Sequence, residues 1–154
     1  MTVNLNLRYL QETFFNSVND SRFYCPSKIH WGVNAFDTAC RHVSGEVALL
    51  FIDQGIADSE NVQALVSACQ PDAPVVIVRS PPSPSAVDRL FAKYGEKQFS
   101  TVVAMGGGST MDMAKIYLAR CMYGSVDGIG MRERRGELPS AEKHATFIAI
   151  PSTA

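Results

Sequence analysis

The chain has 154 residues, of which 46% are hydrophobic and 19% are charged, and its formal net charge is −1. This length suits one domain with a substantial core, and the near-neutral charge without basic clusters argues against nucleic-acid or membrane-surface binding. The first ten residues lack the layout of a signal peptide and every apolar run is too short to cross a bilayer, so we expect a cytoplasmic protein.

The first 46 residues are rich in aromatic side chains but show no clean periodicity. We expect residues 1–46 to form a strand or hairpin and a short helix that cover one side of the same domain. An N-terminal strand that makes a dimer contact is the alternative. Residues 47–154 would then form the α/β core.

Predicted strands alternate with amphipathic helices from residue 47 onward. Val47 to Ile52 is a continuous apolar run that ends at Asp53, which predicts a strand buried on both faces. Either Asp58 or Ser59 would cap the helix that follows. Its apolar residues recur at helical spacing: Val62, Leu65, Val66 and Cys69.

A second strand and a second helix follow Pro71 and Pro74. Val75 to Val78 predicts another strand buried within the sheet. Ser83 and Pro84 are typical of an N-cap and the first residue of a helix. The apolar face of this helix comprises Val87, Leu90, Phe91 and Tyr94.

The most informative segment is Val102 to Lys115, with the sequence VVAMGGGSTMDMAK. Thr101 to Met105 predicts a third strand, the glycines predict a sharp turn, and a helix is expected to open on Ser109. Backbone N–H groups at such a helix start bind phosphate groups. A tight turn without a ligand would look similar, but three adjacent glycines and the polar Ser109, Thr110 and Asp112 favour a ligand. The inner face of the helix would comprise Ala114, Tyr117, Leu118 and Cys121.

Phe147 to Ile150 predicts a last strand before Pro151. Strands that alternate with helices predict a doubly wound, parallel, Rossmann-like α/β fold. In such sheets ligands bind beyond the carboxyl ends of the strands. Asp53, the loop 80–85 and the glycine run all lie at that edge, so the sequence predicts a nucleotide site there.

Cysteines and histidines are scattered along the chain. No cysteine pair has the CxxC spacing, so we expect reduced, structural thiols at Cys25, Cys40, Cys69 and Cys121. His30 lies in a strand-like run, His42 in a predicted helix and His144 in a loop, without the spacing of metal ligands. We therefore expect no metal site and no catalytic residue within this chain.

The segment Gly106 to Lys115 resembles the GGGSxxDxAK signature of the iron-containing (group III) alcohol dehydrogenase family. Other segments of the chain resemble further motifs of that family and occur in the same order along the sequence. Pro26 to Gly32 is similar to its opening strand, Leu49 to Gly55 to its first nucleotide-binding strand, and Ile148 to Ala154 to the start of its IPTTAGTGSE motif. Ser83-Pro84-Ser85 stands where the family often has Asn-Pro-Thr. The resemblance implies the N-terminal half of a dehydroquinate-synthase-like fold, without the helical metal-binding domain.

The resemblance also implies roles for individual residues. Asp53 would bind the adenosine ribose and favour NAD over NADP, although a plain turn residue at the strand end is the alternative. Asp112 would lie near the nicotinamide half, or would only stabilise the helix dipole and pair with Lys115. The implied NAD contacts are Asp53, Ser83, Gly106, Gly107, Gly108, Ser109, Asp112, Ser152 and Thr153.

The complete enzyme is expected to transfer a hydride between a primary alcohol or aldehyde and NAD, and to be a homodimer. The sequence of residues 23–32, FYCPSKIHWG, is similar to that of the 3-deoxy-manno-octulosonate 8-oxidase branch, which oxidises a sugar acid. A divalent metal, iron or zinc, is expected only in residues beyond Ala154, so this chain alone should bind NAD weakly and be inactive. Alternatives are a glycerol dehydrogenase, a dehydroquinate synthase-like enzyme, or a truncated, non-catalytic nucleotide-binding module.

Overall fold

The computed structural model describes residues 27–124 and 145–152, and these are the residues discussed below. The chain divides into two compact units, residues 1–30 and 31–154. All helices and strands given below belong to the second unit, which is described by itself. No helix within the described ranges is long and apolar enough to cross a membrane.

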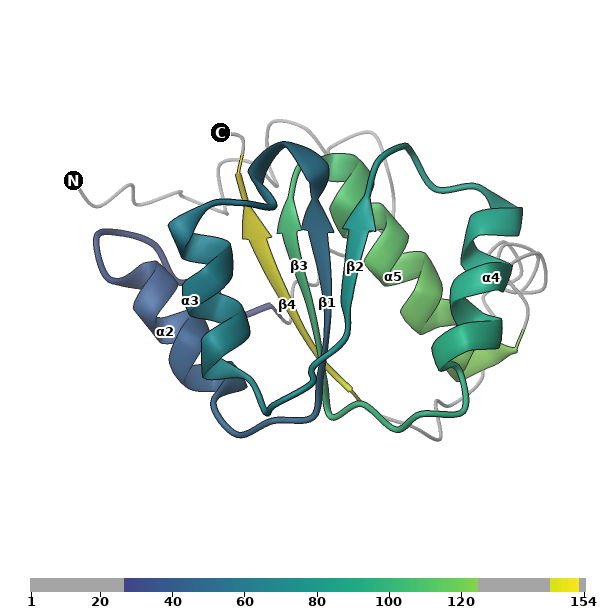
Figure 1. Cartoon of the computed structure of the whole chain (residues 1–154), viewed down its shortest axis with the longest axis horizontal. Coiled ribbons are helices and arrows are strands. Elements are labelled where there is room, and N and C mark those ends of the chain that lie inside the picture. Colours follow the sequence, from purple (N-terminus) through teal and green to yellow (C-terminus); the bar gives the residue numbers. More distant parts are fainter. Residues whose placement is uncertain (1–26, 125–144, 153–154) are drawn as a thin grey trace, which may run out of the picture. The chain divides into compact units, whose positions relative to one another are not determined.

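The second unit is built on a parallel sheet of four strands in the order β2-β1-β3-β4. Leu50 of β1 lies opposite Val75 of β2 and Val103 of β3, and Val103 lies opposite Ile148 of β4. Figure 1 shows all four strands running in the same direction. The strands are β1 (Ala48–Asp53), β2 (Val75–Val78), β3 (Thr101–Gly106) and β4 (Thr146–Pro151). This arrangement confirms the predicted parallel α/β fold.

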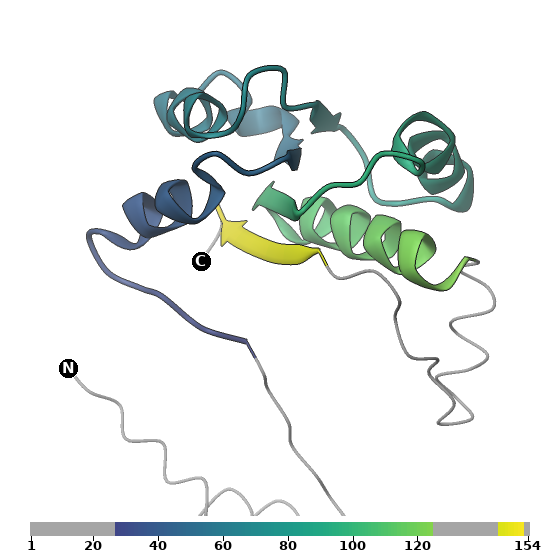
Figure 2. The same ribbon diagram turned by 90° about the horizontal axis from the view of Figure 1, so that it is seen from below.

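Helices cover both faces of the sheet, as a doubly wound fold requires (Figures 1 and 2). The helices are α2 (Ala35–Val43), α3 (Glu60–Ala68), α4 (Pro84–Tyr94) and α5 (Gly108–Tyr123), with a short 3₁₀ turn η1 (Gln54–Ile56) after β1. Helices α2 and α3 lie on one face, and α4 and α5 lie on the other.

Alternate residues of β1 enter two separate cores. Leu49 and Phe51 pack toward α4 and α5, where Tyr117 is also buried. Leu50 and Ile52 pack on the other side, toward α2 and α3. These four residues of β1 are fully buried because the strand lies between two neighbouring strands and two helical layers.

Helices α3 and α4 begin at the serine caps that the sequence predicted. The Ser59 hydroxyl, rather than Asp58, accepts a hydrogen bond from the Val62 N–H and caps α3. Ser83 caps α4, and Pro84 is its first residue. Both helices therefore begin where a side-chain oxygen replaces an absent intrahelical partner.

Three free cysteines fit the prediction of reduced thiols: Cys40, Cys69 and Cys121. The Cys69 thiol donates a hydrogen bond to the Leu65 carbonyl oxygen. Burial raises the pKa of both Cys40 and Cys69, which keeps these thiols protonated. Cys25 lies outside the described residues.

Two strand predictions were wrong. Val75 to Val78 is not buried throughout, since Val75 is 38% exposed and only Val78 is buried. Among the described strands β2 is the last in the row, so no described strand pairs with its other side. Residues 27–31, including His30, form no strand, and Trp31 is 84% exposed. A strand requires a hydrogen-bonded neighbour, and no described strand pairs with this segment.

Candidate functional site

The carboxyl edge of the sheet contains a point where the chain leaves neighbouring strands in opposite directions. From β1 the chain passes through α3 to β2, whereas from β3 it passes through α5 to β4 on the other side. Such a switch point opens a crevice between two strand ends, which is the usual ligand site in doubly wound sheets. The two residues that end these strands are Asp53 and Gly106.

Gly106 is the tightest point of this edge. Its φ of +154° is one that residues with side chains rarely adopt. A Cβ atom built on Gly106 would lie 2.6 Å from the Asp53 Cβ and 2.8 Å from the Thr110 Oγ1. Glycine at this position therefore lets the ends of β1 and β3 and the first turn of α5 meet.

Gly107 and Gly108 have a different environment. Helix α5 has Gly107 as its N-cap and begins at Gly108, one residue before the predicted start at Ser109. The Gly107 carbonyl oxygen already accepts from the Thr110 and Met111 N–H groups, which is why the helix starts early. A Cβ atom on Gly107 or Gly108 would meet nothing within 4 Å. Packing does not require glycine at either position, and open space lies before the helix start.

Asp53 makes two side-chain contacts at this point. Its Oδ1 accepts a hydrogen bond from the Gly55 N–H at 2.8 Å and so caps η1. Its Oδ2 accepts from the Thr110 hydroxyl at 3.3 Å. The turn role considered for Asp53 is thus confirmed, and the contact with ribose stays a prediction.

Thr110 was predicted as a polar residue near a ligand, but it was not among the NAD contacts and its contact with Asp53 was not predicted. In the sequence it is one polar residue in a helical turn, 57 positions from Asp53. In the structure its side chain is fully buried and contacts Asp53 directly. Position 110 lies on the same helical face as buried Ala114 and Tyr117, and this spacing could have predicted that the Thr110 side chain is buried.

Ser152 joins the same edge, because its N–H donates to the Gly106 carbonyl oxygen at 3.0 Å. Ser109 is half-buried in the first turn of α5. Asp112 is exposed and pairs with Lys115 at 3.8 Å, as expected for this i,i+3 spacing. Thr153 lies outside the described residues.

Ser83 is engaged within its own helix. Its hydroxyl accepts from the Ala86 N–H at 3.3 Å and lies 3.3 Å from the Ser85 hydroxyl. The structure thus gives the Ser83 side chain a capping role at the same sheet edge, and its contact with a cofactor stays a prediction.

We expect Ser83→Ala to lower the free energy of unfolding by about 1 kcal/mol, because the N-cap acceptor of α4 is lost. Ser83→Asn, which restores a side-chain oxygen, should stay within about 0.5 kcal/mol of the wild type. Urea unfolding followed by circular dichroism measures both. Equal losses in the two variants would contradict the capping role.

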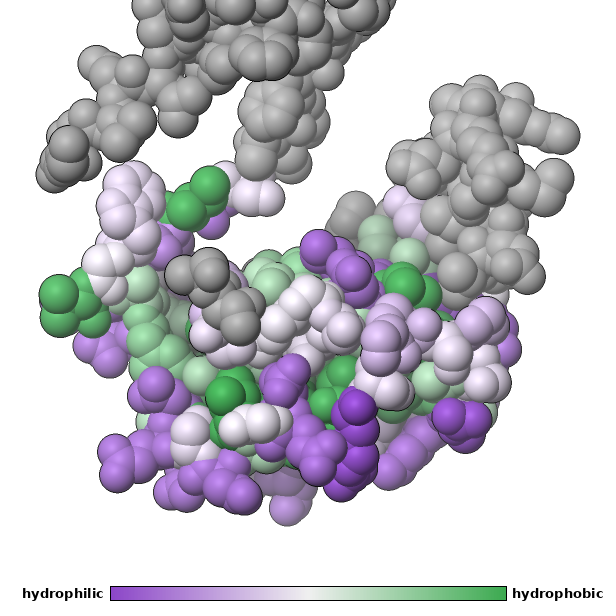
Figure 3. Space-filling view, turned by 90° about the horizontal axis from the view of Figure 1, so that it is seen from above, coloured by the Kyte–Doolittle hydropathy of each residue, from purple (hydrophilic) through white to green (hydrophobic). Residues whose placement is uncertain are grey.

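The carboxyl edge faces the viewer in Figure 3, where purple and nearly white residues predominate and green residues form small separate groups. Within residues 27–124 and 145–152, no group of His, Cys, Asp and Glu side chains could hold a metal ion. The N–H groups at the start of α5 and the Asp53 carboxylate lie at this edge, and such groups bind phosphates and hydroxyls.

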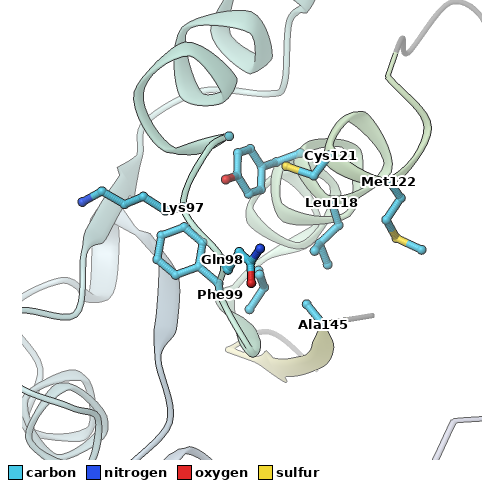
Figure 4. Close-up of a pocket in the computed structure, with 10 residues that line it drawn as sticks. Lys97, Gln98, Phe99, Leu118, Cys121, Met122 and Ala145 are labelled. Carbon is cyan, nitrogen blue, oxygen red and sulfur yellow. The ribbon is translucent and has the colours of Figure 1, made fainter. Parts of the chain in front are cut away.

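A pocket of about 380 Å³ lies at the opposite, amino-terminal edge of the sheet. Figure 4 shows Lys97, Gln98 and Phe99 on one side of it and α5 on the other. Tyr117 also lines this pocket, and burial together with a hydrogen bond to Cys121 raises the pKa of its phenol. A phenol that stays protonated offers no base, and the pocket does not extend the carboxyl-edge site.

Comparisons with known proteins agree with the predicted fold. A family model described as iron-containing alcohol dehydrogenase matches residues 26–154. A 4-hydroxybutyrate dehydrogenase of Cupriavidus necator is 28% identical over 124 residues, which cover 79% of this chain and 32% of that protein.

Two solved structures show the same architecture. An iron-containing alcohol dehydrogenase has a TM-score of 0.62 at 24% identity, over 86% of this chain and 37% of the other. A sulfoacetaldehyde reductase from Bifidobacterium kashiwanohense, in complex with NAD+, has a TM-score of 0.51 at 25% identity, over 78% and 31%. The chain thus spans about a third of the length of these relatives.

Proposed function

Because this chain belongs to the iron-containing alcohol dehydrogenase family, we propose that its carboxyl edge binds the NAD cofactor of an oxidoreductase. The observation that carries the proposal is the open space at Gly107 and Gly108, directly before the start of α5. Glycines that packing does not require allow a ligand to approach the backbone. The sulfoacetaldehyde reductase that shares this fold is in complex with NAD+, which supports the same cofactor here.

The two ends of the site suit different parts of NAD. The N–H groups and the positive dipole end of α5 favour the diphosphate at Gly106 to Ser109. The Asp53 carboxylate would accept from the hydroxyls of the adenosine ribose. Asp112 would face the nicotinamide half from the first turns of the same helix. The remaining contacts would come from Ser83, Ser152 and Thr153.

We propose hydride transfer between a primary alcohol and NAD as the reaction of the complete enzyme. The divalent metal implied by the family, iron or zinc, would be held by residues outside this chain, which by itself should be inactive. A relative named for 4-hydroxybutyrate, a primary alcohol on a carboxylic acid, supports a hydroxy acid as substrate. A sugar acid, as in the 3-deoxy-manno-octulosonate 8-oxidase branch, falls in the same chemical class. Homodimer assembly and a cytoplasmic location stay predictions.

We expect Asp53→Ser to weaken NAD binding about tenfold, the size of one lost charge-assisted hydrogen bond. Serine keeps a side-chain oxygen that can cap η1, so the fold should be retained. NADP should bind the variant at least as well as it binds the wild type, because a carboxylate no longer repels its 2′-phosphate. Isothermal titration calorimetry with both cofactors measures the change.

The same titration decides between an NAD-binding chain and a non-catalytic module of another kind. If the wild-type chain gives no heat with NAD and NAD does not raise its melting temperature, the proposed function is wrong. Unchanged NAD affinity in Asp53→Ser would leave NAD binding intact but remove Asp53 from the site.

A further inference from the structure

We propose that Thr110 is a positioning residue that sets the preference for NAD over NADP by orienting the Asp53 carboxylate. This inference rests on the proposed NAD site. It concerns a residue that lies behind the site and touches Asp53, and it does not require Thr110 to touch the cofactor.

Both oxygens of the Asp53 carboxylate accept hydrogen bonds. One oxygen accepts from the Gly55 N–H, and the other accepts from the Thr110 hydroxyl. A carboxylate that accepts one hydrogen bond on each oxygen cannot rotate without losing one of them. Each oxygen keeps a further lone pair for a ligand hydroxyl.

The surroundings of Thr110 hold its contact with Asp53 in place at the switch point. The side chain is fully buried in the first turn of α5, so solvent does not compete for its hydroxyl. Gly106 lies against both partners, since a Cβ atom there would be 2.8 Å from the Thr110 Oγ1 and 2.6 Å from the Asp53 Cβ. The ribose acceptor on β1 is thereby tied to the helix whose N-terminus would receive the diphosphate.

The two cofactors should respond differently to the loss of this hydroxyl. A hydrogen bond between Asp53 and a ribose 2′-hydroxyl depends on direction, so it weakens when the carboxylate turns. Repulsion between Asp53 and a 2′-phosphate depends mainly on distance, so it changes little. Loss of the Thr110 donor should therefore weaken NAD binding and leave NADP binding nearly as it was.

The test uses Thr110→Val, which removes the donor and keeps the shape, and Thr110→Ser, which keeps the donor. We expect Thr110→Val to lower the ratio of NAD to NADP affinity roughly fivefold, and Thr110→Ser to keep the wild-type ratio. Calorimetric titration of the whole 154-residue chain with NAD and with NADP gives both affinities. Thr110→Ala serves in place of valine if the valine variant does not fold.

A double-mutant cycle with Asp53→Ser separates positioning from a general loss of structure. Without the carboxylate, Thr110→Val should change the cofactor ratio no further. Equal weakening of both cofactors, or the same change in the Asp53→Ser background, would overturn the role of Thr110. A wild-type chain that binds neither cofactor would instead overturn the proposed function.

Discussion

Substitution of Gly106 by alanine is expected to lower the free energy of unfolding by about 4 kcal/mol. Two effects add. Alanine at a φ of +154° is strained by about 1 to 3 kcal/mol. Its methyl group would also overlap Asp53 and Thr110, and such overpacking costs about 1 to 3 kcal/mol. Urea unfolding of the two chains, followed by circular dichroism, measures the difference.

Gly107→Ala is the matched control, because a methyl group at Gly107 meets nothing within 4 Å and φ there is −81°. Its free energy of unfolding should stay within about 1 kcal/mol of the wild type, the loss expected when alanine replaces glycine at an N-cap. If Gly106→Ala proved as stable as Gly107→Ala, the close approach of β1, β3 and α5 described above would be wrong.

Substitution of Gly108 by alanine, unlike that of Gly106, should leave the fold stable and should weaken NAD binding. Alanine restricts the unfolded chain and suits the first turn of α5, so stability should stay the same or rise by about 1 kcal/mol. The methyl group would occupy the space proposed for the diphosphate. NAD affinity should fall roughly thirtyfold, or about 2 kcal/mol, because the methyl group keeps the diphosphate away from the N–H groups at the start of α5.

Calorimetric titration with NAD and thermal melting of the same samples test this pattern. Gln98→Ala is the control for binding, because Gln98 lines the pocket at the opposite edge of the sheet and its removal should leave NAD affinity unchanged. A Gly108→Ala chain that binds NAD as the wild type does would show that the space before α5 is not where the diphosphate lies.

The sequence alone predicted most of the fold. Four apolar runs predicted the four strands, and serine caps at positions 59 and 83 set the starts of α3 and α4. These features are local, since burial on two faces and the satisfaction of terminal N–H groups act within a few residues. The position of each strand in the sheet is not local, which is why β2 was wrongly expected to be buried along its whole length.

For the site, the sequence predicted that Asp53 and the glycine run would meet at the carboxyl edge, because strand order and handedness follow from the alternation of strands and helices. It could not distinguish the three glycines from one another. Only the structure shows that Gly106 is required by packing whereas Gly107 and Gly108 face open space.

The contact between Thr110 and Asp53 could not be predicted from the sequence either. The sequence gives the residue type of Thr110 and predicts its place in the helix. Its contact with Asp53, however, joins residues that are 57 positions apart. Such a contact depends on how closely a helix start approaches a neighbouring strand end. That distance is set by the packing of the whole sheet and both helical layers, and no local pattern in the sequence specifies it.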